Sequence, residues 1–81
     1  MSPVDKQFVI DVADSIRIDY TIDDSEEFIT FNTVFRKITI SLKPIILHNK
    51  AFMRSKLPRE DFVNKAADYI RECFKESGDK V

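Results

Sequence analysis

The fold is decided by the stretch LPREDFVNKAADYIRECFKESG, residues 57–78. Apolar side chains recur in it at helical spacing and form one stripe, which consists of Phe62, Val63, Ala66, Ala67, Ile70, Cys73 and Phe74. Pro58 suits a first helical position, and Glu60 and Asp61 suit the positive end of a helix dipole. Gly78 stands where a left-handed residue commonly ends a helix. The pattern predicts an amphipathic helix that must bury its apolar stripe against the rest of the chain.

Alternating apolar residues earlier in the chain predict the sheet on which this helix would lie. Period-two alternation or β-rich composition marks three runs, which are residues 16–22, 28–31 and 34–42. The polar run 23–26 indicates a turn. Residues 32–33 fit either a turn or a bulge, and a switch in the alternation indicates a bulge or register break near residues 32–36. Pro44 would end the third strand or mark a sheet edge.

The first residues fit two structures. Ser2 as N-cap and Pro3 as the first helical residue indicate a helix over residues 3–14, but the apolar residues there also alternate as in a strand. We favour the helix, because the connection at residues 13–15 has no Gly or Asn for a tight hairpin turn.

The segment after the sheet completes the predicted fold. Residues 45–47 form a short apolar run that we interpret as a fourth strand, and residues 48–56 form a basic connection. The prediction is a single α+β domain over residues 1–81. It contains a small, mostly antiparallel sheet of three or four strands, packed against a helix over residues 58–77, with a short N-terminal helix.

The composition is that of a small folded protein. The chain has 81 residues, of which 43% are hydrophobic and 33% are charged. A single Cys excludes an internal disulfide, whereas a secreted domain of this size usually has several. No apolar run approaches the ~20 residues that span a bilayer, and the first residues do not resemble a signal peptide. We therefore expect a cytoplasmic protein without a membrane partner.

The charges are distributed unevenly along the chain. Residues 1–35 contain eight acids and two bases, whereas residues 36–65 contain eight bases and two acids. If the two regions lie on different faces, they favour association through complementary potentials; if they lie side by side, they cancel. Because a chain this short buries a small core, self-association as a homodimer is one alternative and a monomer is the other.

The sequence contains no recognisable catalytic, metal or cofactor motif. Cys73 and His48 are the single thiol and the single imidazole, and the spacing of Cys73 places it in the apolar stripe of the helix. One Cys and one His cannot complete a zinc site, and a lone Gly excludes a glycine-rich phosphate loop. The acids of residues 19–27 lack the spacing of a calcium loop. We expect neither an enzyme nor a cofactor.

The basic middle of the chain is the candidate binding region. Its bases lie among Phe35, Phe52 and Met53, and charge together with aromatic residues is found on many interaction surfaces. The predicted partner-binding residues are Phe35, Arg36, Lys37, Lys43, Lys50, Phe52, Arg54, Lys56 and Arg59.

Ordinary solubilising charge is one interpretation of these bases, and two functions fit the region as well. We favour a small, non-enzymatic protein-binding regulator or inhibitor that acts by occupying a surface of another protein. An accessory protein of a phage or mobile element would fit such a chain, although no residue indicates it. The alternative is a nucleic-acid-binding protein that uses the basic stretch 36–59. Against that alternative, the pI is about 5.7, whereas dedicated nucleic-acid domains are usually basic overall.

Overall fold

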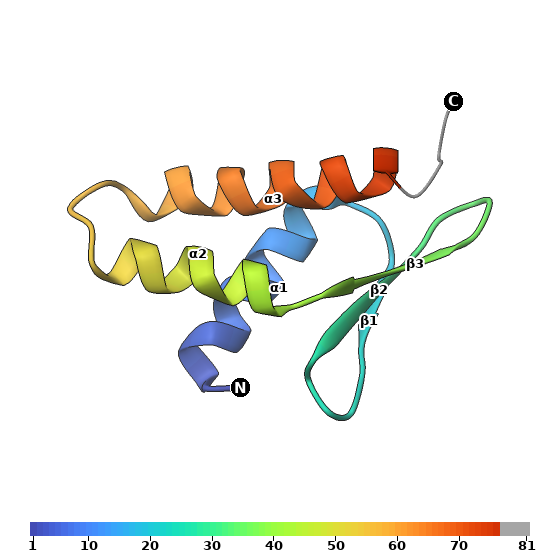
Figure 1. The fold of residues 1–81 in the computed structure, drawn as a ribbon, viewed down its shortest axis with the longest axis horizontal. Coiled ribbons are helices and arrows are strands. Elements are labelled where there is room, and N and C mark those ends of the chain that lie inside the picture. Colours follow the sequence, from blue (N-terminus) through green and yellow to red (C-terminus); the bar gives the residue numbers. More distant parts are fainter. Residues whose placement is uncertain (77–81) are drawn as a thin grey trace.

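A computed structural model describes residues 1–76. Six elements follow one another, and they are α1 (Pro3–Ile16), β1 (Tyr20–Ile22), β2 (Phe28–Asn32), β3 (Lys37–Ser41), α2 (Lys43–Met53) and α3 (Arg59–Glu76). Figure 1 shows α2 toward one end of the molecule, α3 running along most of its length, and the β2–β3 hairpin extending at the other end. The predicted α+β architecture is confirmed, with three strands and three helices. The helix end predicted at Gly78 lies outside the described residues.

Helix α1 confirms the helical alternative for the first residues. The Ser2 hydroxyl accepts a hydrogen bond from the Asp5 N–H at 3.1 Å, and Pro3 begins the helix. Its buried stripe is Phe8, Val9, Val12 and Ala13. Arg17 ends the helix in the left-handed conformation, with φ 63°. The strand predicted over residues 16–22 is therefore wrong for its first four residues, because the chain is still helical at Ile16 and β1 begins only at Tyr20.

The sheet is an antiparallel meander in the order β1-β2-β3. Its inner face contains the row Ile22, Ile29 and Ile40, which are direct cross-strand partners. Its outer face contains the row Thr21, Thr30 and Thr39. One face is therefore apolar and packed, and the other is polar and exposed to water.

The third strand begins later than the predicted 34–42, so that prediction is wrong at its first residues. Val34 and Phe35 form a two-residue loop between β2 and β3, and the Thr33 N–H donates to the Arg36 carbonyl across it at 2.9 Å. The Thr33 hydroxyl also donates to that carbonyl and accepts from the Arg36 N–H. The predicted irregularity near residues 32–36 is thus a chain reversal rather than a bulge.

Helix α2 replaces the predicted fourth strand at residues 45–47, which is wrong. It also includes most of the segment predicted as a basic connection at residues 48–56, and only the residues after Met53 connect elements. Pro44 lies in the first turn of this helix, where its missing N–H is tolerated, instead of ending a strand or marking a sheet edge. The helix buries Ile45 and Asn49.

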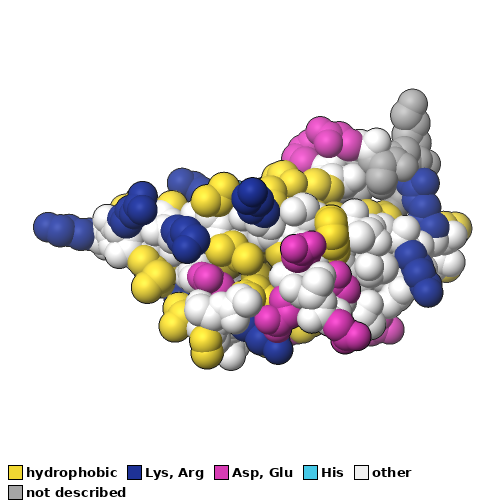
Figure 2. Space-filling view, turned by 60° about the horizontal axis from the view of Figure 1, so that its bottom comes forward, with side chains coloured by type: hydrophobic (Ala, Val, Ile, Leu, Met, Phe, Trp, Pro, Cys, Tyr) yellow, Lys and Arg dark blue, Asp and Glu magenta, His cyan; other side chains and the backbone are white. Residues whose placement is uncertain are grey.

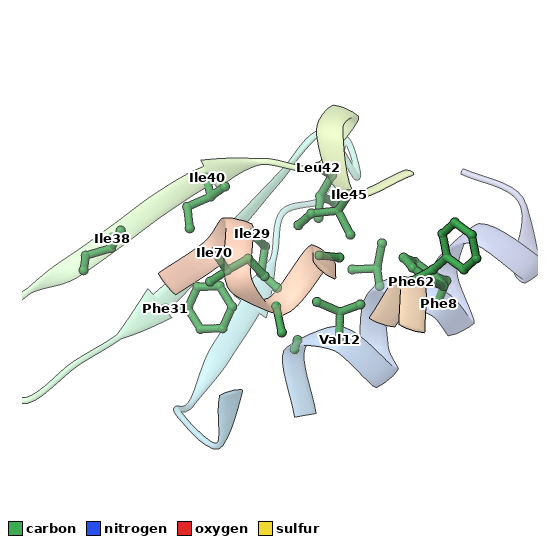
Figure 3. Close-up of a cluster of buried hydrophobic side chains, with 14 residues drawn as sticks. Phe8, Val12, Ile29, Phe31, Ile38, Ile40, Leu42, Ile45, Phe62 and Ile70 are labelled. Atoms are coloured by element: carbon green, nitrogen blue, oxygen red, sulfur yellow. The ribbon is translucent and has the colours of Figure 1, made fainter. Parts of the chain in front are cut away.

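Helix α3 confirms the long C-terminal helix and packs against the other elements. It buries Phe62, Ala66, Ala67 and Ile70, and its Phe74 ring meets Phe31 of the sheet edge-on at 5.3 Å. Figure 3 shows how side chains of the sheet's inner face and of all three helices converge on one core. Helix α2 lies along α3, so its opposite face is available to solvent.

Candidate interaction surface

The predicted binding residues do not form one surface. Phe35, Arg36 and Lys37 lie at the end of the β2–β3 hairpin, where Phe35 is 82% exposed. Arg54 and Lys56 lie at the connection between α2 and α3. Figure 1 places these two groups at opposite ends of the longest axis of the molecule. The fold therefore does not bring all of the predicted residues together in a single partner-binding patch.

The side chains of two of the predicted residues make contacts within the fold. The Phe52 ring packs against Phe62 with 5.8 Å between the ring centres. The Arg59 guanidinium donates to the Asp11 carboxylate at 2.6 Å and lies 5.5 Å from the centre of the Phe8 ring. Both side chains stabilise contacts between helices, so neither is available as a partner anchor.

Two of the other predicted residues, Lys43 and Lys50, share one face of α2, and Arg54, the C-cap residue just after the helix, continues that face. They occur at intervals of seven and four residues, which are whole turns of a helix, and Leu47 lies on the same face. We call Lys43, Leu47, Lys50 and Arg54 the basic stripe. All four residues are exposed, and Leu47 is 58% exposed. The inward face of α2 holds Ile45, Asn49 and Phe52, so the basic stripe points away from the core.

The basic stripe contains one sign of charge only. The segment from Lys43 to Arg59 has no acidic residue, whereas an ordinary solvated helix face mixes both signs. Figure 2 shows Lys and Arg side chains predominating over the end of the molecule where α2 and α3 connect, and Asp and Glu side chains mostly nearer the middle. The uneven charge of the sequence is therefore expressed on the surface.

A groove of about 490 Å³ runs beside the first turns of α2. We call it the α2 groove; its lining residues include Phe28, Ile46, Leu47, Lys43 and Lys50. Phe28 is 43% exposed although it is a large apolar residue. Glu26 and Glu27 line the side of the groove formed by the turn between β1 and β2. Bases and acids thus lie on opposite sides of an apolar floor.

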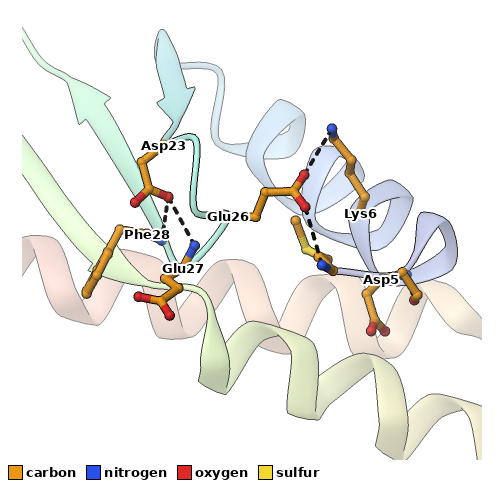
Figure 4. Close-up of polar contacts among 8 residues, drawn as sticks. Asp5, Lys6, Asp23, Glu26, Glu27 and Phe28 are labelled. Carbon is orange, nitrogen blue, oxygen red and sulfur yellow. Dashed lines mark hydrogen bonds and ion pairs between the residues drawn. The ribbon is translucent and has the colours of Figure 1, made fainter.

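Asp23 fixes the turn that carries the acidic side of the groove. One of its carboxylate oxygens accepts from the N–H groups of Glu27 and Phe28, at 3.0 and 3.1 Å, as Figure 4 shows. The Ser25 hydroxyl donates to its other oxygen. These hydrogen bonds, the one from Ser25 first, lower the pKa of Asp23. The turn is therefore an ordered structure, which holds Glu27 and Phe28 in place.

The two glutamates of the turn have different surroundings. Glu26 pairs with the Lys6 ammonium at 3.1 Å and with the Met1 amino group at 3.3 Å. The contact with Lys6 is the main cause of the lowered pKa of Glu26. Figure 4 shows Glu26 pointing toward α1 and Glu27 pointing away from it. Glu27 is therefore the carboxylate of this turn that is exposed beside the α2 groove.

The start of α2 departs from the usual rules for helix ends. Leu42 occupies the N-cap without a side-chain hydrogen bond, and the first turn contains Lys43 and no acid. The Ser41 hydroxyl accepts from the Lys43 N–H at 3.3 Å and supplies part of a cap. A cation at this position opposes the helix dipole, so Lys43 does not stabilise the helix there.

The residues considered for chemistry show no catalytic arrangement. His48 shares a hydrogen bond with the Pro44 carbonyl at 2.8 Å, within its own helix. Cys73 is half-buried, and its hydrogen bond with the Tyr69 hydroxyl is the main cause of the raised pKa of Tyr69. Within residues 1–76, no group of three or more His, Cys, Asp or Glu residues is placed to hold a metal ion.

Sequence reasoning missed the apolar part of this surface. Ile46 and Leu47 are predicted in a strand but lie in α2, whereas Phe28 lies in a strand as predicted. The spacing of Lys43, Leu47, Lys50 and Arg54, which fits a helix and no strand, is a signal for Leu47. No sequence signal places Phe28 beside it.

Comparison of the chain with protein-family models, with curated proteins and with solved structures gives no match. In the described part of the chain, no helix combines the length and the apolar character that crossing a bilayer requires. A functional assignment therefore rests on the residues of the surface itself.

Proposed function

We propose that this protein is a small non-enzymatic module that binds another protein through the basic stripe and the α2 groove, and so regulates or inhibits it. The observation that supports this proposal is the combination of two exposed apolar residues, Leu47 and Phe28, with the cations that α2 contributes to the same groove. Interfaces of this kind use apolar anchors for affinity and charges for orientation.

Protein is a better fit than nucleic acid for the same surface. Lys43, Lys50 and Arg54 can neutralise phosphates, which keeps nucleic acid as the second candidate. However, Glu27 lies beside the groove and would repel a phosphate backbone there. Of the two aromatic residues among the bases, Phe52 packs against Phe62, and Phe35 lies on the hairpin at the other end of the molecule, so neither ring is placed beside the basic stripe to stack on bases.

Site-specific cross-linking tests the proposal. A photoreactive phenylalanine analogue replaces Leu47 in the protein expressed in its source cell, and adducts are resolved by mass after illumination. We expect one discrete protein adduct, and we expect it to weaken when Lys50→Glu is added, because the charge reversal repels the partner.

The matched control places the same photoreactive residue at Thr39. This side chain is exposed on the outer face of the sheet, away from the basic stripe. The proposal requires the discrete adduct at position 47 and not at position 39. Identical patterns at both positions, or an adduct at position 47 that nuclease removes, would contradict it.

A further inference from the structure

We infer that the occupant of the α2 groove is an amphipathic α-helix of the partner, with an acidic edge along the basic stripe and a basic residue facing Glu27. This inference rests on the proposed function and specifies the partner's binding segment. The observations that support it are the spacing of the cations, the apolar floor and the different charges of the two sides.

The spacing of the cations favours a helical segment over an extended one. Lys43 and Lys50 are separated by seven helical residues, or about 10.5 Å, and Lys50 and Arg54 by four, or about 6 Å. A helix lying alongside presents residues i, i+7 and i+11 at the same intervals. An extended chain repeats a side about every 6.8 Å, which does not match the first interval.

The apolar residues that line the groove would supply most of the binding affinity, because the exposed cations of the basic stripe supply little. Exposed ion pairs each contribute little, so the anchors must be apolar side chains of the partner. Leu47, Ile46 and Phe28 offer such anchors a common surface. A partner helix would present its anchors at positions i, i+3 or i+4, and i+7.

The acidic side of the groove selects the orientation of the partner helix. A helix with acids on both edges would place one edge against Glu27 and lose favourable interactions there. A helix with one acidic and one basic edge satisfies both sides in one orientation only. Glu26 adds little to this choice, because Lys6 and the Met1 amino group already neutralise it.

A peptide selection identifies the preferred segment. A library of displayed helical peptides, randomised at the exposed positions, is selected on the intact protein. We expect the enriched peptides to share apolar residues at i, i+3 or i+4, and i+7, with Asp or Glu along one edge. Binding of an enriched peptide is then measured by fluorescence anisotropy for the wild type and its variants.

The variants separate the groove from general charge effects. The dissociation constant should rise about tenfold or more for Lys50→Glu and for Leu47→Glu. It should stay within about twofold for Lys37→Glu, which makes the same charge change on the hairpin at the other end of the molecule. A peptide whose acidic edge is replaced by Lys should bind the Lys50→Glu variant better than it binds the wild type.

The outcomes distinguish this inference from the function on which it rests. If the enriched peptides lack the acidic edge, or if Leu47→Glu leaves their affinity unchanged, the helical partner segment is wrong while protein binding stands. If no peptide is enriched but the cross-link at position 47 persists, the partner does not present a helix. Failure of the cross-link together with the selection overturns both.

Discussion

At the scale of single residues, polar contacts between distant positions hold the elements around the α2 groove. Asn49 is 1% exposed and is the one buried polar side chain among the described residues. Its amide group donates to the Asp5 carboxylate at 2.7 Å, which joins α2 to α1. The pair formed by Lys6 and Glu26 joins α1 to the turn between β1 and β2. Helix α1 is therefore the support on which both sides of the groove are placed.

Low pH should weaken the contacts that join α1 to α2 and to the turn between β1 and β2. The pKa of Asp5 is lowered, mainly by the hydrogen bond from Asn49, and that of Glu26 is lowered, mainly by Lys6. The stability that both carboxylates contribute is fully present above their unfolded pKa values, near 3.8 and 4.5, and is lost as the pH falls through the lower folded values. The urea midpoint should therefore fall below about pH 4.5. A midpoint that stays constant to about pH 2.5 would contradict this, and Asn49→Ala should reduce the dependence.

A second residue, Arg17, adopts a conformation that suits glycine better. An L-residue in the left-handed region costs about 1–2 kcal/mol, and glycine avoids that cost but loses more chain entropy on folding. We expect Arg17→Gly to raise the free energy of unfolding by up to about 1 kcal/mol. The control Ser15→Gly, inside the helix, should lower it. Urea denaturation measures both, and a less stable Arg17→Gly protein would show that the Arg17 side chain makes a stabilising contact.

At the scale of elements, α2 packs into the core with one face and, in the proposed function, binds the partner with the other. Its inward residues pack with α1 and α3, while its first turn lacks an acidic residue and contains Lys43. At Lys43 the requirements of stability and of binding therefore differ. A base there is unfavourable for the helix and favourable for the proposed acidic partner.

The substitution Lys43→Glu exploits that separation. Negative charge at the start of α2 should raise the free energy of unfolding by about 0.3–1 kcal/mol, because it complements the helix dipole. The same change should weaken binding of an acidic helix. Thermal denaturation and anisotropy on one preparation check both effects. A variant that is more stable and binds less well excludes unfolding as the cause, whereas a variant that binds equally well would remove Lys43 from the interface.

The elements also show why part of the fold was predictable. Helix α3 was found because its apolar stripe is long and uninterrupted, and α1 because Ser2 and Pro3 mark its start. Helix α2 was missed because Asn49 occupies the middle of its inward face and breaks the apolar pattern. The reversal between β2 and β3 was left open as a turn or a bulge, because Val34 and Phe35 are not typical turn-forming residues. Of the predicted binding residues, sequence position alone could not show which were occupied, as Phe52 and Arg59 are.

At the scale of the whole molecule, the fold is elongated, with principal extents of 39 × 27 × 18 Å. The hairpin and the connection between α2 and α3 lie at opposite ends, so the basic stretch of the sequence is divided between them. The homodimer considered from the size of the chain remains a prediction, which sedimentation equilibrium across a range of protein concentrations will check.

The divided charge predicts weak interaction with nucleic acid. With about three cations on the basic stripe and a net charge of −1, binding of short oligonucleotides should be detectable only at low salt. Its logarithmic salt dependence should have a slope of about −3 or shallower. Fluorescence anisotropy with labelled single and double strands measures this directly. Tight binding that survives at physiological salt would favour the nucleic-acid function, with Lys43, Lys50 and Arg54 as the first residues to replace.

The exposed loop between β2 and β3 is a suitable site for attaching a label to the protein. Val34 is 95% exposed and sits at the tip of a hairpin that projects away from the helices. A fluorophore or an affinity tag attached there should leave the fold intact, since nothing in the core depends on the Val34 side chain. The label would sit at the far end of the molecule from the connection between α2 and α3. Immobilisation through this loop should present α2 to the solution in one orientation, which suits surface-based binding measurements and single-molecule work.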